Sequence, residues 1–175
     1  MNDRAHIRLC TPGDEFALSL LGQATFLESF AGMLDGADIL AHCASKHSLA
    51  VYQRWLQSED VSIWIAEIEP GNAPVGYLVL TPPDLPIADP RTDDREIKRI
   101  YLLHPFQGSG LGKRLMQEAF AHVRQQGCRR VLLGVFSRNT NAIAFYQRLG
   151  FVNVGDRIFK VGNTDCSDIV LALTL

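Results

Sequence analysis

The run of glycines between residues 107 and 113, Gln-Gly-Ser-Gly-Leu-Gly-Lys, is the stretch whose chemistry is easiest to read. An apolar, strand-like segment precedes it, and a helical pattern starts at about Gly110 and closes at Gly127, which fits a C-cap glycine. The first N–H groups of a helix are unpaired and partly positive, and glycines leave them uncovered. The run therefore predicts a cradle for an anionic, phosphate-like group; the alternative is a glycine-rich turn that binds nothing.

Two nucleotide-binding motifs of similar composition do not fit this spacing. A P-loop needs glycine where Gln107 stands, and a dinucleotide fingerprint that begins at Gly108 needs glycine where Lys113 stands. Neither kind of site is predicted.

A second segment whose side chains could take part in chemistry is NTNAIAFYQRLGF, residues 139–151. Asn139 and Tyr146 are about two helical turns apart and so lie on one face of a helix. A carboxamide and a phenol on one face can both donate hydrogen bonds to a ligand. The alternative for Tyr146 is a core aromatic beside Phe145.

Together, the Q-x-x-G-x-G pattern from Gln107 to Gly112 and the 139–151 segment resemble the two signature motifs of the GNAT N-acetyltransferase superfamily, in the expected order. Within it the chain is most similar to PaiA-type spermidine/spermine N-acetyltransferases, through residues 25–30, 96–102, 133–135 and 168–175. The resemblance implies an α/β (α+β) fold with a mixed, mostly antiparallel sheet and helices on both faces, in a single domain over residues 1–175. It also implies an enzyme that moves the acetyl group of acetyl-CoA to a primary amine by direct attack in a ternary complex, without a metal.

The resemblance assigns roles to individual residues as well. Tyr146 would be the general acid for the departing thiol, and the Leu102 amide would polarise the thioester carbonyl. A phenol with a pKa of about 10 is a weaker acid than a thiol at about 8.5, so a hydrogen bond to the sulfur is expected to matter more than full proton transfer. The implied cofactor-binding residues are Ile100, Tyr101, Leu102, Gln107, Gly108, Ser109, Gly110, Leu111, Gly112, Lys113 and Asn139.

A base is also needed, because an amine with a pKa of about 10.4 is neutral only about once in a thousand at neutral pH, a deficit of about 4 kcal/mol. Glu96 stands where the superfamily's histone acetyltransferases have their glutamate base. Strand alternation would put Glu96, Lys98, Ile100 and Leu102 on one face. The alternative is a strand-end carboxylate paired with Lys98 or Arg99.

The sequence gives less direct evidence for the identity of the acceptor amine. In this superfamily the N-terminal helices and the proline-rich loop line the acceptor groove. We therefore predict that three residues of the first helix contact the substrate: Phe26, Glu28 and Phe30. Ribosomal-protein acetyltransferases of the superfamily place a glutamate where Gly134 stands, which disfavours that substrate class. Acidic side chains could attract a cationic polyamine, although such residues are often only solvated surface: Glu28, Asp35, Asp38, Asp84 and Asp89. A peptide or protein amine, and a catalytically silent acyl-CoA-binding sensor, are the alternatives.

Composition narrows the remaining choices. A chain of 175 residues, 47% of them hydrophobic, has the length of one domain, and a net charge of −2 without a basic tract gives no sign of nucleic-acid binding. No signal-peptide run opens the chain and no window approaches about 18 apolar residues, so no membrane partner and a cytoplasmic location are expected. A homodimer is left open. The cysteines (10, 43, 128, 166) and the histidines His42, His47, His104 and His122 lack metal-ligand spacing, and these histidines are expected at the surface.

The elements that must position these residues follow from periodicity. Strands are expected at 6–10, 61–68, 75–80, 129–136, 151–160 and 167–174, besides the one before the glycine run. Helices are expected at 14–33, weakened by Gly22 and Gly32, at two places within 34–60, and at 110–126 and 139–149. Residues 69–74 should close a hairpin, and residues 81–94, with four prolines, should form a structured loop.

Overall fold

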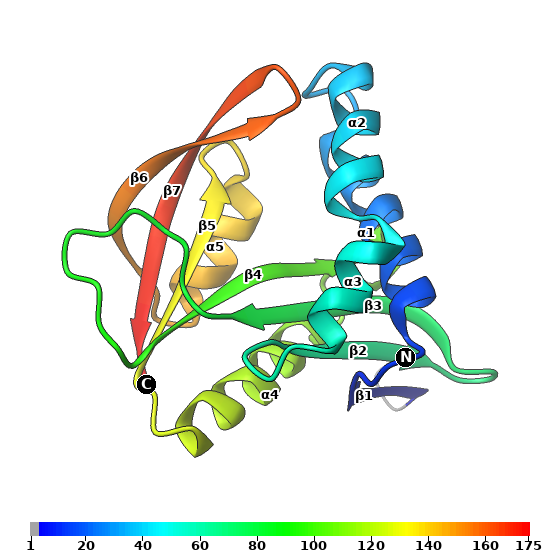
Figure 1. Ribbon diagram of the computed structural model, residues 1–175, viewed down its shortest axis with the longest axis horizontal. Coiled ribbons are helices and arrows are strands. Elements are labelled where there is room, and N and C mark those ends of the chain that lie inside the picture. The colour runs from blue at the N-terminus through cyan, green and yellow to red at the C-terminus, as the bar shows by residue number, and fades with distance from the viewer. Residues whose placement is uncertain (1–3) are drawn as a thin grey trace.

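The structure is a computed structural model that describes residues 4–175; residues 1–3, which the predicted domain includes, lie outside the described range. The described residues form a seven-stranded sheet with the order β1-β2-β3-β4-β5-β7-β6 (Figure 1). All neighbouring strands are antiparallel except β4 and β5. The sheet is therefore mixed and mostly antiparallel, as the sequence predicts. The strands are β1 (Ala5–Leu9), β2 (Ser62–Ile68), β3 (Ala73–Thr81), β4 (Asp94–Leu102), β5 (Arg130–Phe136), β6 (Val152–Val161) and β7 (Thr164–Thr174).

Helices cover both faces of the sheet. On one face α1 (Glu15–Phe30), α2 (Gly36–Lys46) and α3 (Leu49–Leu56) form a layer, and on the other lie α4 (Leu111–Gln125) and α5 (Thr140–Arg148). A short 3-10 helix, η2 (His104–Phe106), links β4 to the glycine run, and the sequence pattern does not predict it. None of the described helices has the length and apolarity needed to cross a membrane.

Helix α4 shows why the local sequence folds as it does. Its apolar side chains recur on one face and are all buried against the sheet: Leu111, Leu115, Met116, Ala119, Phe120 and Val123. Gly127 follows the helix end with a φ of +73°, in the left-handed region that glycine tolerates best. The helix beginning near Gly110 and its glycine stop are thus confirmed.

The predicted boundaries hold to within a few residues elsewhere, and the 69–74 turn does close the β2–β3 hairpin. Helix α1 is shorter than expected, ending at Phe30, but continues through Gly22. Gly22 has a packing role: a Cβ there would collide with the His47 ring and the Tyr52 hydroxyl. Glycine is therefore what lets α3 and the α2–α3 junction approach α1 closely.

Strands β4 and β5 separate soon after they meet. Their parallel ladder covers only Asp94–Glu96 against Arg130–Leu132. Beyond it β5, β7 and β6 rise away from β4, as Figure 1 shows, and the seam between the two strands opens.

A β-bulge lies where this seam begins. In the β3–β4 ladder Val79 faces Arg99 but Leu80 faces Ile97, so Lys98 is an extra residue. The predicted shared face is therefore partly wrong. Ile100 packs on the α4 side, whereas Glu96 follows the opposite parity, because the bulge interrupts the alternation.

Candidate active site

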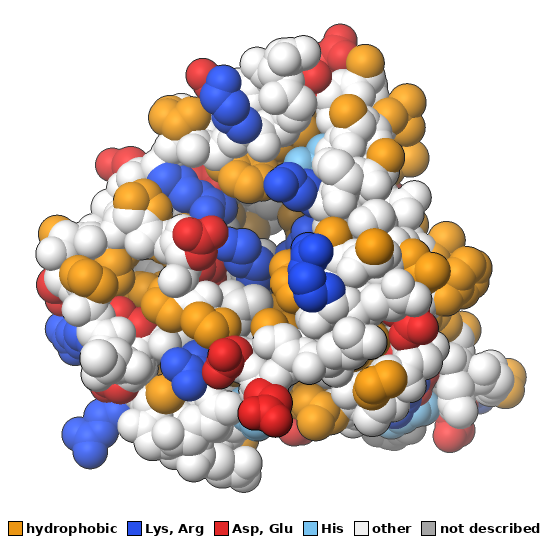
Figure 2. Space-filling view, viewed as in Figure 1, with side chains coloured by type: hydrophobic (Ala, Val, Ile, Leu, Met, Phe, Trp, Pro, Cys, Tyr) orange, Lys and Arg blue, Asp and Glu red, His pale blue; other side chains and the backbone are white. Residues whose placement is uncertain are grey.

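One large cavity occupies the opened seam, with a volume of about 1160 Å³. It reaches from the glycine run at the start of α4, past β4 and α5, to side chains from α1, α2, α3, β6 and β7. In Figure 2 the centre of this face is hollowed, and Lys and Arg side chains gather around the hollow. The residues that line it fall into two groups, which we name the cofactor arm (residues 107–113, α5 and the seam-facing backbone of β4) and the acceptor arm (the N-terminal helices, Arg99 and Tyr101 of β4, and the β6–β7 hairpin).

The cofactor arm begins with backbone groups. Gly108 and Gly110 have φ angles of +73° and +85°, conformations that side-chain-bearing residues rarely adopt. Within residues 4–175 no hydrogen bond is made by the N–H groups of either glycine. Gly108, Gly110, Gly112 and Lys113 line the cavity at the positive end of α4. This geometry fits the diphosphate of a coenzyme.

Strand β4 supplies the next section of the arm. The N–H of Leu103 bonds to Val75 of β3, so by alternation the N–H and C=O of Leu102 face the opened seam. The Leu102 carbonyl accepts a hydrogen bond from Gln107 Nε2 at 3.2 Å. Backbone groups of Leu102, and by the same parity Ile100, are thus exposed to an extended ligand arm.

Helix α5 brings Asn139 and Tyr146 to the same arm. The Asn139 side-chain oxygen caps the helix by accepting from the Ala142 N–H at 3.1 Å, which leaves its NH₂ group free to donate to a ligand. Tyr146 is buried and lines the cavity, and its hydroxyl has no partner in the described residues. Burial, and then the neighbouring Tyr101, raise the pKa of Tyr146 well above its usual value. The phenol therefore stays protonated and is suited to donate a hydrogen bond.

Two predicted cofactor residues turn their side chains away from the cavity. Ser109 Oγ donates to the Phe106 carbonyl at 2.6 Å, and Leu111 is 2% exposed in the core. Their backbones still shape the turn. The other nine predicted cofactor residues all line the cavity.

Glu96 is 1% exposed and is held by its neighbours. One carboxylate oxygen accepts from the Asp84 N–H at 2.7 Å, and the other lies 3.1 Å from Lys98 Nζ. Of the two pairings that the sequence left open, the structure contains the one with Lys98. Lys98 and Asp84 line the cavity; Glu96 does not.

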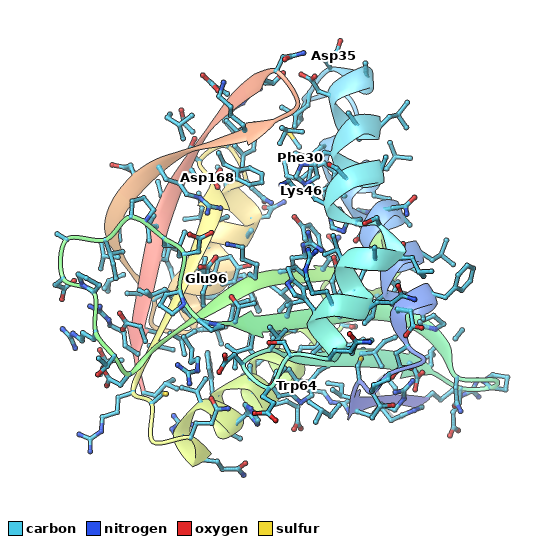
Figure 3. All side chains as sticks on the ribbon, in the orientation of Figure 1. Phe30, Asp35, Lys46, Trp64, Glu96 and Asp168 are labelled. Atoms are coloured by element: carbon cyan, nitrogen blue, oxygen red, sulfur yellow. The ribbon has the colours of Figure 1, made fainter. Side chains whose placement is uncertain are left out.

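A second carboxylate, Asp168 on β7, does line the cavity (Figure 3). Its Oδ2 accepts from Arg157 Nε and Nη2 at 3.1 and 3.0 Å, while Oδ1 has no hydrogen-bond partner in the described chain. Burial raises the pKa of Asp168 despite Arg157. Gly134 makes room for this pair, because a Cβ at that position would come within 2.6 Å of the Arg157 guanidinium.

The acceptor arm corrects two expectations. Phe26 and Phe30 line it as predicted, but Glu28 points elsewhere and accepts from the His104 N–H at 3.1 Å. His42 and His47 are buried in this arm, not at the surface: Phe26 stacks on His42 at 4.2 Å between ring centroids. Helical periodicity does not reveal them, because α2 and the α2–α3 junction pack against α1 as well as the sheet.

The acidic residues expected to attract a polyamine are mostly engaged outside the cavity. Asp35 caps α2, Asp38 holds the β6–β7 turn through Asn163 N and Thr164 Oγ1, and Asp89 pairs with Arg130. Figure 3 shows Asp35 at the far end of the α1–α2 layer. Asp84 alone of the five lines the cavity, and it lies 3.4 Å from Lys98.

The residues that sequence reasoning missed are side chains of the acceptor arm: Lys46, Arg54, the Tyr101 phenol, Arg157 and Asp168. They come from five separate elements, and no spacing along the chain links them. Only Arg157 has a signal in the sequence: Gly134, a glycine within a predicted strand, leaves room for a long side chain beside it. In the described residues there is no group of three or more potential metal ligands.

A mixed sheet opened between two parallel strands, with a backbone anion cradle and a phenol along the opening, defines the class: a protein built to hold an acyl-coenzyme at a splayed seam. The chain belongs to the acetyltransferase (GNAT) family, whose sequence profile matches residues 33–151.

Individual relatives agree with this assignment. An uncharacterized N-acetyltransferase of Mycobacterium tuberculosis (strain ATCC 25618 / H37Rv) is 37% identical over 103 residues, 58% of this chain and 60% of that one. The spermine/spermidine N(1)-acetyltransferase of Bacillus subtilis (strain 168) is 34% identical over 65 residues, 37% of this chain and 43% of that one. The chain thus spans about three fifths or less of these curated relatives. The PaiA N-acetyltransferase of Thermoplasma acidophilum, solved with coenzyme A, shares the fold, with a TM-score of 0.77 at 20% identity over 98% of this chain and 99% of that one.

Proposed function

We propose that the protein transfers the acetyl group of acetyl-CoA to a primary amine of a small molecule, by direct attack while both substrates are bound. The observation that carries this proposal is the single cavity that joins the anion cradle and Tyr146 to an acceptor arm on the other side of β4. A purely binding protein would need only the cofactor arm.

The coenzyme would supply the thioester acetyl group and its thiol leaving group. The N–H groups of residues 108–113 would hold the diphosphate at the start of α4. The Leu102 N–H would donate to the thioester carbonyl, where negative charge develops during attack, and the Asn139 amide would bind the pantetheine arm. The Tyr146 hydroxyl would donate to the departing sulfur; its raised pKa makes a hydrogen bond, rather than complete proton transfer, its main contribution.

Two carboxylates can be proposed as the base. Glu96, the sequence-based choice, has both oxygens engaged and does not line the cavity, so it would need a water relay. Asp168 has one oxygen without a partner in the described residues, lines the cavity, and has a pKa raised by burial, which makes it a better proton acceptor than an ordinary aspartate. We favour Asp168 as base and assign Glu96 to fixing Lys98 and the bulge.

A polyamine acceptor is supported by the name of the Bacillus subtilis relative. The charges of the acceptor arm do not favour it, because the carboxylates expected to bind a polycation are engaged elsewhere. A cytoplasmic location and a homodimer stay predictions.

The test is acceptor-dependent release of free CoA thiol, measured with purified protein, acetyl-CoA and a panel of amines and short peptides. We expect release with at least one small amine and none without an acceptor. Coenzyme binding, shown by calorimetry, with no release for any amine would instead favour the acyl-CoA sensor.

A further inference from the structure

Three cations line the acceptor arm without acidic partners. Arg99 lies on β4, Lys46 at the end of α2 and Arg54 on α3, and all three face the same cavity. Within residues 4–175 none of them has a carboxylate oxygen within 4.0 Å. Figure 3 shows Lys46 in the space between α2 and the β5–β7 side.

Arg99 is held rigidly. Its guanidinium lies over the Trp55 ring at 4.6 Å, its Nη1 donates to the Tyr52 hydroxyl at 2.9 Å, and its Nη2 donates to the Lys46 carbonyl at 2.6 Å. These contacts use two of the five N–H groups of a guanidinium. A positioned guanidinium with donors left over is a preorganised receptor for a carboxylate or phosphate.

Two enclosed arginines of this protein, one of them in the same cavity, have carboxylate partners built in. Arg130 bonds to both Asp89 and Asp94, and Arg157 bonds to Asp168. An ion pair formed away from water usually has its counter-charge built in, because an uncompensated charge there is costly. Arg99 differs from them, and its counter-charge is therefore expected to arrive with a ligand.

His47 is a further polar group in the acceptor arm. His47 is fully buried and lines the cavity; its Nδ1 is 3.0 Å from the Tyr52 hydroxyl, and its Nε2 has no partner in the described residues. Burial, followed by Arg99, lowers the pKa of His47 to about 2 and that of His42 to about 4. Both rings therefore stay neutral, and the positive charge without a carboxylate partner in the acceptor arm comes from Arg99, Lys46 and Arg54.

The balance of charge over the whole acceptor arm points the same way. Its Asp side chains are Asp84 and Asp168, each already within 4.0 Å of Lys98 or Arg157. A polyamine would carry several positive charges to an arm whose two carboxylates already have cation partners. An amine with one anionic group would instead neutralise the cation cluster while its amino group reached Asp168.

We propose that the acceptor is a primary amine that also carries a negatively charged group, a carboxylate or a phosphate, and that Arg99, Lys46 and Arg54 bind that group. The proposal rests on the proposed acetyl transfer. It names a substrate class opposite in charge to the polyamines.

Matched amines that differ in one group test it. Lysine and 1,5-diaminopentane differ by a carboxylate, as do tyrosine and tyramine, whereas phosphoethanolamine and ethanolamine differ by a phosphate. We expect kcat/KM for the anionic member of at least one pair to exceed that of its partner roughly 10- to 100-fold, the range of one charged hydrogen-bonded contact. The pair that shows the preference identifies the anion. Preference for diaminopentane or spermidine, or equal rates within every pair, would overturn the proposal.

Variants locate the contact. Arg99→Gln, and the double variant Lys46→Gln with Arg54→Gln on exposed positions, should raise KM for the anionic member and leave KM for its neutral or cationic partner unchanged. Arg124→Gln, an exposed cation at the end of α4, is the matched control and should alter neither. Equal effects on both members of a pair would contradict the assignment.

A binding measurement separates this proposal from the proposed function. Calorimetric titration with N-acetyl-lysine and with N-acetyl-1,5-diaminopentane should show tighter binding of the carboxylate, lost in Arg99→Gln. Absence of thiol release with every amine, with coenzyme bound, would refute the acetyl transfer. Thiol release confined to polyamines would refute only the anionic acceptor.

Discussion

The two arms of the cavity are built in different ways. The cofactor arm is made largely of backbone groups from one continuous stretch, β4, η2 and the start of α4, with α5 lying against it. The acceptor arm is made of side chains from α1, α2, α3, β4, β6 and β7, which meet only in the folded chain. A backbone site is encoded locally by glycine spacing, whereas a side-chain site depends on how distant elements pack. The first arm should therefore tolerate changes in the second.

The largest effect should come from removing the base. Asp168→Asn keeps the shape of the side chain but cannot take a proton, so we expect kcat/KM to fall about 10²- to 10⁴-fold. Because burial raises the pKa of Asp168, the wild-type acidic limb should lie above the ordinary carboxylate value of about 3.9, with activity lost as the pH falls through it. The pH profile of kcat/KM checks both points.

Glu96→Gln is the matched comparison for the base. It should retain the wild-type acidic limb and lose activity modestly, through the loosened Lys98. A missing limb in Glu96→Gln with a normal limb in Asp168→Asn would reverse the assignment.

Tyr146→Phe should lower kcat about 10²-fold, because it deletes the hydrogen bond to the departing sulfur and leaves the ring in place. The dissociation constant of CoA should stay within about twofold of the wild-type value, since the phenyl ring still packs beside Phe151. Single-turnover kinetics and calorimetry measure the two quantities. An unchanged kcat would remove Tyr146 from the mechanism.

Gly108→Ala should weaken CoA binding about tenfold and leave the acceptor arm intact, since the φ of +73° must change or be strained. Gly32→Ala is the matched control: it has a φ of +81° and open space around it, but does not line the cavity. Both variants should lose about 1–2 kcal/mol of unfolding free energy, the cost of a side-chain-bearing residue in the left-handed region. Similar CoA affinities in the two would show that the cradle does not bind the coenzyme.

Gly22→Ala should have the smallest effect on chemistry but a clear one on packing. The added methyl group would collide with His47 and with Tyr52, which accepts a hydrogen bond from Arg99, so we expect about 1–3 kcal/mol less unfolding free energy and a higher acceptor KM. The dissociation constant of CoA should not change. Gly36→Ala, at a helical position with open space, is the control and should be neutral or slightly stabilising. Weaker CoA binding in Gly22→Ala would mean that the two arms are coupled.

The same contrast explains what could be predicted from the sequence. The glycine turn, the α4 stripe and the Asn139–Tyr146 face were predictable, because each depends on neighbours in the chain. Two features were not predictable: the burial of His42 and His47, and the lack of a carboxylate partner for Arg99 in the described residues. Each depends on tertiary contacts between α1, α2, α3 and β4.

The bulge at Lys98 has a consequence for the whole sheet. The β4–β5 ladder stops at Glu96, two residues before the extra residue. A bulge bends its strand, so deleting Lys98 would straighten β4 while keeping Arg99 and Ile100 on their present sides. Strands β4 and β5 could then pair in one continuous ladder. Such a protein would gain main-chain hydrogen bonds but close the space its ligands need. One inserted residue thus keeps the seam open, at the cost of a longer β4–β5 ladder.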